Sequence, residues 1–211
     1  MISTTDAKLT QYINTNYDGA GILAFEKFSQ QLFDCSLNDD VHALTILQRY
    51  QIALPLWKTV SNRVDNIDMV IIESSSQEGS TNNGSVLHII TDDKAFIVDS
   101  LSELIHSLGF KIKMFLHPVI KSHEFNNRGD ESVLYFELST KLNTQAKELL
   151  KEKIHQLLSD IQAVTSDWSE MLNQIESVVC ANNQLNKNYD LNSFLHWLSQ
   201  DNFVFLGHYI F

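Results

Sequence analysis

The segment Val86–Ile120 constrains the fold most, because its hydrophobic period changes from two to 3.6 and back to two. Alternating apolar residues at its start are typical of a strand, and the spacing from Ile97 to Leu108 gives a helix one apolar face. Gly109 follows at once and suits the end of a helix, because glycine tolerates a positive φ. Phe110–Leu116 then alternates again. The segment therefore predicts one strand–helix–strand unit.

Three further runs extend this unit into a sheet. Ile67–Ser74 and Ser132–Ser139 read as strands, and Thr144–Val164 has the apolar spacing of a long helix. The polar loop Ser75–Ser85 can join the first of these strands to Val86 as a hairpin. Strand, helix, strand, strand, helix is the order of a ferredoxin-like or ACT-like sandwich, in which Ile67–Ser74 can fill the edge position. We therefore predict an α+β fold, an antiparallel sheet with helices on one face.

The residues on either side of this sandwich are predicted to be mainly helical. In the N-terminal part we expect Asp39-Asp40 to open a helix, Pro55 to end or kink it, and Trp57 to pack in the core. The apolar run that closes the chain reads as a strand of a following domain. The predicted organisation is a helical lead (1–64), an ACT-like α+β domain (65–166) and a helical connection with that first strand (167–211).

Composition excludes several classes of partner. Lys plus Arg is 15 and Asp plus Glu is 26, which gives a net charge of −11. Duplex nucleic acid and anionic membranes both require a basic surface, so we expect neither as a partner. No apolar run approaches the roughly 20 residues that span a bilayer, and the N-terminus lacks the pattern of a secretory signal. The two cysteines are too few for a disulfide framework, so we expect a cytoplasmic protein with reduced thiols.

The sequence contains no convincing catalytic site. Glycine-rich nucleotide loops, a G-x-S-x-G elbow and H-E-x-x-H are all missing from the sequence. His88, His117 and His123 do not have the spacing of a metal site, so structural or solvated roles are expected for them. We expect no catalytic residue, no metal and no cofactor in this segment.

The turn after Val86–Thr91 is the best candidate for ligand binding. A helix N-terminus there offers backbone N–H groups to a carboxylate, while Asp92 and Asp93 can meet an amino group. A zwitterionic amino acid is therefore a chemically reasonable ligand. We favour the other interpretation, in which Asp92 and Asp93 cap the helix, because two carboxylates repel an anion and can occupy the same donors themselves.

The sequence resembles one family along nearly its whole length. Thr91–Ile120, with its T-D-D start and His117-Pro118-Val119 end, is similar to the N-terminal ACT-like domain of the large NAD-specific glutamate dehydrogenases. Three more motifs follow in the family's order, namely Asp167-Trp168, Phe194-Leu195-His196-Trp197-Leu198 and the stretch from Asp201 to Gly207.

The resemblance implies a parent enzyme that converts L-glutamate, NAD and water to 2-oxoglutarate, ammonia and NADH. Its catalytic domain would lie C-terminal of residue 211, and no catalytic or NAD-binding residue of the family falls in this segment. The expected role is therefore regulation or assembly. The expected partners are the remaining domains of the parent chain, further copies in a homo-oligomer and, in the regulatory role, an amino-acid effector.

One departure from the family pattern bears on the choice between these roles. ACT domains that bind amino acids commonly carry Pro-Gly before the first helix, where glycine lets the backbone approach the ligand. The corresponding turn here is Asp93-Lys94-Ala95-Phe96, and its β-carbons disfavour that binding mode. Assembly is therefore the favoured role, and effector binding through Asp92, Asp93, Lys94 and Phe96 is the alternative.

Overall fold

The computed structural model describes residues 4–34, 41, 43–74, 84–124, 128–184 and 189–202. The chain divides into two compact units, residues 1–158 and residues 159–211. Three sequence predictions lie wholly or mostly outside the described residues: the helix start at Asp39-Asp40, the loop after Ser74 and the strand at the C-terminus.

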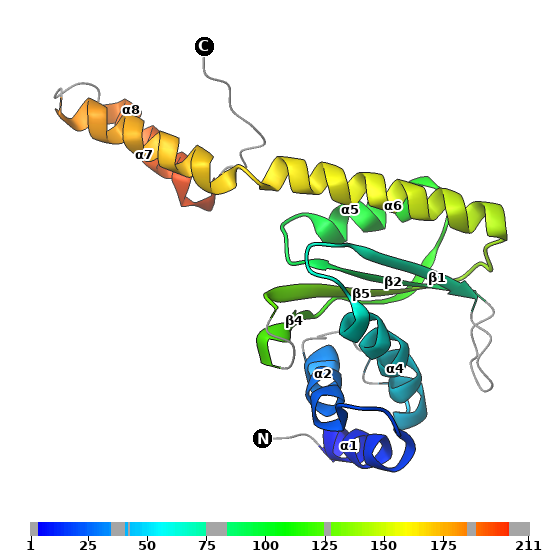
Figure 1. The fold of residues 1–211 in the computed structure, drawn as a ribbon. Helices are drawn as coiled ribbons and strands as arrows, with labels where there is room; N and C mark the ends of the chain where they lie inside the picture. Colours follow the sequence, from blue (N-terminus) through cyan, green and yellow to red (C-terminus); the bar gives the residue numbers. More distant parts are fainter. Residues whose placement is uncertain are drawn as a thin grey trace. The chain divides into compact units, whose positions relative to one another are not determined.

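The first unit is built on an antiparallel sheet of five strands (Figure 1). The strand order is β1-β2-β5-β3, and β4 also pairs with β5. Because β2 and β3 both run antiparallel to β5, they are parallel to each other, and α5 joins them as a split βαβ unit. The predicted α+β class and the predicted edge position of the first strand are confirmed. The strands are β1 (Met69–Ser74), β2 (Ser85–Asp92), β3 (Ile112–Leu116), β4 (Val119–Lys121) and β5 (Asp130–Leu138).

The edge formed by β3 and β4 is interrupted at His117-Pro118, because proline has no N–H to give to a ladder. The carbonyl of Pro118 still accepts a hydrogen bond from the N–H of Val133 at 3.1 Å. After β4, a short 3₁₀ helix, η1 (Ser122–Glu124), leaves the sheet. Both β3 and β4 pair with β5, one on each side of the interruption.

Two helices, α5 (Ile97–Ser107) and α6 (Thr144–Thr165), lie on one face of the sheet (Figure 1). Gly109 has φ +82°, and the N–H groups of Gly109 and Phe110 donate to the carbonyls of His106 and Ile105. This is the Schellman arrangement, so the predicted glycine stop is confirmed. The two helices bury Ile97, Leu101, Ile105, Leu150, Ile154 and Leu158.

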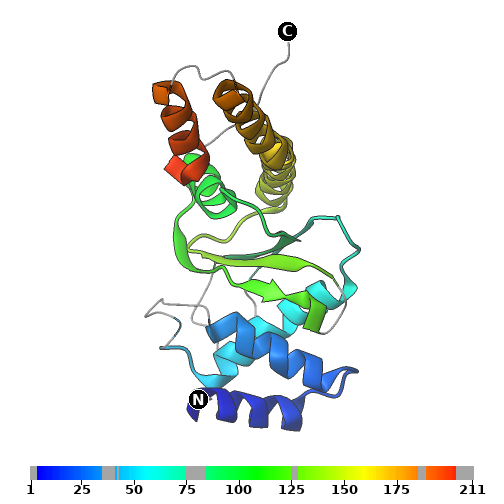
Figure 2. The same cartoon turned by 90° about the vertical axis from the view of Figure 1, so that its left-hand side faces the viewer.

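The opposite face carries the N-terminal helices α1 (Thr4–Asn16), α2 (Ile22–Asp34) and α4 (Ile46–Asn62) (Figures 1 and 2). One apolar cluster joins them to the sheet and includes Phe25, Phe28, Leu56, Ile90 and Val133. The predicted sandwich thus has a second helical layer, and this is why β2 and β5 are buried on both sides.

The helix α4 differs from the sequence prediction at Pro55. Thr45 and Gln48 form a capping box at its start, and the helix continues through Pro55 to Asn62. Of the two predicted effects of Pro55, an end or a kink of the helix, the end is wrong. Trp57 is 7% exposed and packs against Phe25 and Phe28, as expected.

The second unit contains α7 (Trp168–Gln184), α8 (Tyr189–Trp197) and a π-helical turn, η2 (Leu198–Asn202). Phe194 and Trp197 stack with ring centroids 6.2 Å apart, and both side chains are about half exposed. Among the described helices, none combines the length and the apolar character needed to cross a membrane.

Candidate functional site

The turn between β2 and α5 holds all four residues that the sequence singled out. Asp92 ends β2, and Phe96 is the residue before α5, with φ +70° and no side-chain cap. A bulky residue in the left-handed region is strained, since its β-carbon crowds the backbone. The prediction that Asp92 and Asp93 cap α5 is wrong, because both carboxylates bind elsewhere.

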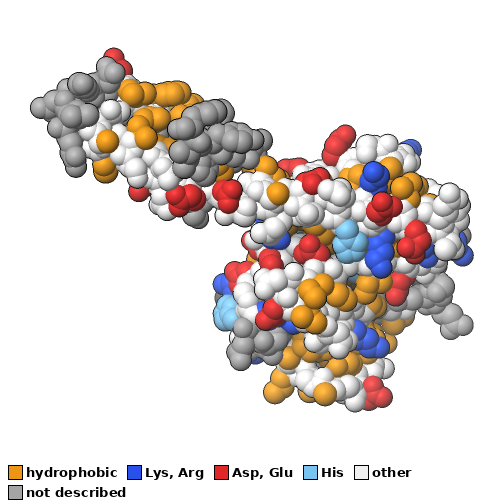
Figure 3. Space-filling view, turned by 45° about the horizontal axis from the view of Figure 1, so that its top comes forward, with side chains coloured by type: hydrophobic (Ala, Val, Ile, Leu, Met, Phe, Trp, Pro, Cys, Tyr) orange, Lys and Arg blue, Asp and Glu red, His pale blue; other side chains and the backbone are white. Residues whose placement is uncertain are grey.

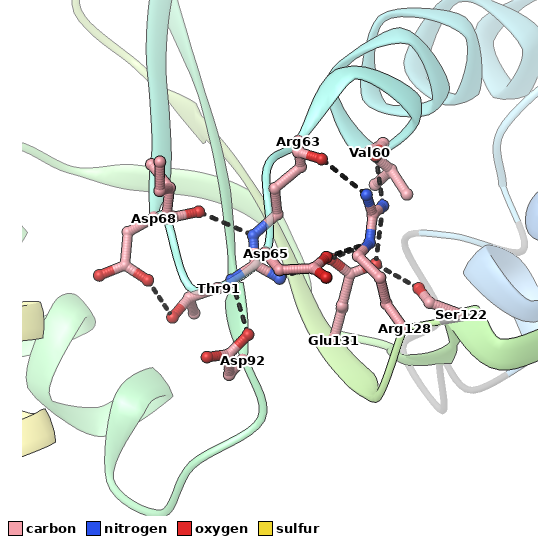
Figure 4. Close-up of polar contacts among 10 residues, drawn as sticks. Val60, Arg63, Asp65, Asp68, Thr91, Asp92, Ser122, Arg128 and Glu131 are labelled. Carbon is pink, nitrogen blue, oxygen red and sulfur yellow. Dashed lines mark hydrogen bonds and ion pairs between the residues drawn. The ribbon is translucent and has the colours of Figure 1, made fainter. Parts of the chain in front are cut away.

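Asp92 binds the guanidinium of Arg63 at the end of α4 (Figure 4). Arg63 Nη2 donates to Asp92 Oδ1 at 2.7 Å, and the Asp92 side chain remains 42% exposed. The arginine is itself the C-cap residue of α4. Asp92 therefore connects the start of the turn to the helical layer.

A buried ion pair lies directly behind this contact. Arg63 Nη1 donates to Glu131 Oε1 at 2.5 Å, and both side chains are 1% exposed. Arg63 Nε donates to the carbonyl of Ile67 at 2.8 Å. Burial alone would lower the pKa of Arg63, but its hydrogen bonds to Glu131 and Asp92 outweigh burial and raise that pKa. Arg63 is therefore held in its charged form.

Two further residues complete the surroundings of Glu131 (Figure 4). The hydroxyl of Ser122 donates to Glu131 Oε2. Arg128 Nε lies 3.3 Å from Glu131 Oε1, while its Nη atoms donate to the carbonyls of Val60 and Arg63. We call Arg63, Asp92, Arg128 and Glu131 the ionic joint. It ties the end of α4 to β2 and β5, and each of its buried charges has an opposite charge beside it.

Asp93 takes part in a second polar chain. The hydroxyl of buried Ser132 donates to Asp93 Oδ1 at 2.6 Å, and His117 Nε2 lies 3.3 Å from Ser132 Oγ. Burial lowers the pKa of His117, while the negative charge of Asp93 acts in the opposite direction. His117 is therefore mainly neutral at pH 7.

Serine, histidine and aspartate side by side suggest a hydrolase, but the direction of the hydrogen bonds argues against it. A nucleophilic serine donates its proton to histidine, and the aspartate holds the histidine. Here Ser132 donates its proton to Asp93, so His117 Nε2 must be the donor to Ser132. Ser132 is also completely buried. The trio is a structural support for the turn.

The remaining two candidates differ in exposure. Lys94 is half-buried, and the Phe96 side chain is 41% exposed. The structure therefore brings Asp92 and Asp93 together with Arg63, Glu131 and Ser132, none of which is a site residue expected from the sequence. One signal was present in the sequence: Glu131 is a charge at the start of a strand that is otherwise mostly apolar.

The histidines and acidic residues form no metal centre within the described parts of the chain, where no group of three or more His, Cys, Asp or Glu side chains could hold an ion. His88 is buried and stacks on Tyr135, with ring centroids 5.6 Å apart. Its burial lowers its pKa to about 4.

Comparison with known proteins gives one family. No curated protein matches the chain. The family model described as "Glutamate dehydrogenase, ACT1 domain" matches residues 28–175, which run from within α2 to within α7 and include the sheet, the ionic joint and the β2–α5 turn. This match covers well over half of the 211 residues, as the resemblance of its motifs predicts. The chain belongs to the glutamate dehydrogenase ACT1 domain family.

Proposed function

We propose that this segment is a non-catalytic assembly module of an NAD-dependent glutamate dehydrogenase. One observation favours an assembly role over the binding of an effector. The two carboxylates of the β2–α5 turn bind the protein's own groups, Arg63 and Ser132, at 2.7 and 2.6 Å. A ligand amino group would have to displace these donors. The turn also has Phe96 in its left-handed position, where a glycine would let a ligand approach the backbone.

Exposed apolar side chains also support assembly. In the first unit, Phe115 on the edge strand β3 is 38% exposed and Leu149 on α6 is 47% exposed. Figure 3 shows hydrophobic side chains at the surface among the charged ones. In the second unit, the stacked pair Phe194 and Trp197 is exposed as well. Contacts with other domains or with a second copy of the chain would bury such groups.

In this proposal the chemistry belongs to another part of the parent chain. That part binds NAD and oxidises L-glutamate to 2-oxoglutarate and ammonia, while this segment contributes no group to catalysis. The partners of this segment are the other domains of the enzyme and further copies in a homo-oligomer.

The proposal can be tested by deleting this segment from a glutamate dehydrogenase that contains it. We expect the truncated enzyme to sediment as a smaller oligomer, while the isolated 211-residue chain shows no glutamate-dependent reduction of NAD. Phe194→Ser in the intact enzyme should weaken assembly, whereas Lys153→Ser, which alters an exposed residue of α6, should not. An enzyme that keeps its full oligomer without residues 1–200 would refute the assembly role.

A second function, binding of an amino-acid effector, is favoured by one feature of the same turn. The residue before α5 provides no side-chain cap, so the first N–H groups of this helix receive no hydrogen bond from it. Thermal melting with each of the twenty amino acids tests this role. A rise in melting temperature that disappears in Asp93→Ala would establish the effector role, and no rise with any amino acid would end it.

A further inference from the structure

A separate pocket lies among the N-terminal helices, on the face of the sheet opposite α5 and α6. Its volume is about 410 Å³, within the range of about 300–1,000 Å³ that is usual for small-molecule sites. The loop between α1 and α2 forms one side and the C-terminal half of α4 forms the other. The lining residues are Tyr17, Ala20, Gly21, Ala24, Trp57, Lys58, Ser61 and Asn62.

The aromatic wall of this pocket is held in place by the protein itself. The indole N–H of Trp57 donates to the hydroxyl of Tyr17 at 3.1 Å, and that hydroxyl donates to the carbonyl of Ala20 at 2.9 Å. The ring of Tyr17 folds back over Gly19, where a β-carbon would lie only 2.5 Å from it. Trp57 also stacks on Phe25, with ring centroids 5.8 Å apart. The wall therefore presents rigid apolar surface whose polar atoms are already bonded.

The electrostatics of the pocket favour an anion. Lys58 is the one charged residue of the lining and is exposed. Gly21 precedes α2, its carbonyl accepts the first helical hydrogen bond from Phe25, and it has no side chain with which to cap the helix. The first turn of α2 also contains no acidic residue. The partial positive charge of this helix start therefore adds to that of Lys58.

Asp18, the carboxylate nearest to Gly21 along the chain, is not among the lining residues. The pocket thus combines a flat apolar wall, a lysine and a helix start in one cavity.

We propose that this pocket binds a small carboxylic acid, with its carboxylate at Lys58 and the start of α2 and its apolar body against Trp57. The site is independent of the β2–α5 turn and of the role proposed for that turn. An apolar body is required because the lining is mostly carbon, and a single carboxylate is required because the lining carries a single cation.

Benzoate and benzyl alcohol are a matched pair of probes, since they have nearly the same shape and differ in charge. The indole N–H resonance of Trp57 in a ¹⁵N-labelled chain, assigned with Trp57→Phe, reports binding directly. We expect benzoate to shift this resonance with saturation at a Kd of about 1 mM or below, and benzyl alcohol to bind at least about tenfold more weakly.

Two variants test the location. Lys58→Ala should weaken benzoate binding at least about tenfold, and Ala24→Leu should abolish it by filling the pocket, while Lys153→Ala on α6 should leave it unchanged. The proposal is overturned if benzoate does not shift the Trp57 resonance, if both probes bind equally, or if Lys58→Ala binds benzoate as well as the unmodified chain does. Unchanged amide spectra away from the pocket show that each variant is folded.

Discussion

Replacement of Arg63 by methionine is the sharpest test of the ionic joint. Methionine keeps most of the length of the side chain and removes its charge. The change deletes the hydrogen bonds to Glu131, Asp92 and the carbonyl of Ile67. Glu131, which is 1% exposed, then retains only Arg128 as a cationic partner in the joint.

The size of the effect follows from the burial of that carboxylate. Removal of one partner from a buried ion pair typically costs about 3–5 kcal/mol, because the other charge stays desolvated. Arg128 and Ser122 still contact the carboxylate of Glu131, so the loss should lie at the lower end of this range. We therefore expect a loss of about 3 kcal/mol at pH 7.

Urea unfolding followed by the fluorescence of Trp57 measures this loss, with Trp168 and Trp197 replaced by phenylalanine so that only the first unit reports. The matched control is Asp92→Asn, which should cost no more than about 1 kcal/mol because the Asp92 side chain is 42% exposed. The double variant Arg63→Met/Glu131→Gln should be more stable than Arg63→Met alone at pH 7. A loss below about 1 kcal/mol, or a double variant no more stable than Arg63→Met, would refute the reasoning.

Three further predictions concern single residues. Burial lowers the pKa of His88 to about 4, so the unfolded chain binds more protons between pH 6.5 and 4, and stability must fall as the pH falls through that range. His88→Phe should flatten this dependence in urea midpoints at pH 7 and 4.5, and an unchanged slope would contradict the assignment. Gly109→Ala should destabilise by about 1 kcal/mol through its backbone alone, because φ is +82° and an added β-carbon meets no atom within 4 Å. Phe96→Gly should raise the melting temperature by removing strain worth about 1 kcal/mol, and a lower melting temperature would show that the Phe96 side chain contributes more than its backbone costs.

The elements that rest on local periodicity could be predicted from the sequence. The strands, the face of α5 and the Gly109 stop each depend on neighbours within a few residues, where the spacing of apolar side chains is informative. The edge position of β1 also followed, because a hairpin connection to β2 restricts where that strand can pair.

The polar contacts of the turn could not be predicted in the same way. Asp92 binds a residue 29 positions earlier, and Arg63 reaches Glu131 across 68 positions. Local rules treated Asp92 and Asp93 as helix caps, because capping is the partner that a carboxylate finds nearby. At Pro55 a local rule predicts an end of the helix that does not occur. Packing of α4 against the sheet overrides the local preference for ending the helix there.

Arg63 makes two contacts in the ionic joint, one with Glu131 and one with Asp92. These contacts differ in how easily a ligand could replace them. A ligand shifts an equilibrium only by its difference in affinity for the two states. To break the contact between Arg63 and Glu131 it would have to offset the loss of a buried ion pair, about 3–5 kcal/mol. The half-exposed contact between Arg63 and Asp92 is worth only about 0–1 kcal/mol, so a weak ligand or a neighbouring domain could replace it. Arg63 would then remain fixed to Glu131 while Asp92 moved. Of the two contacts, the one with Asp92 is therefore easier to replace, while Asp93 still holds the turn to buried Ser132.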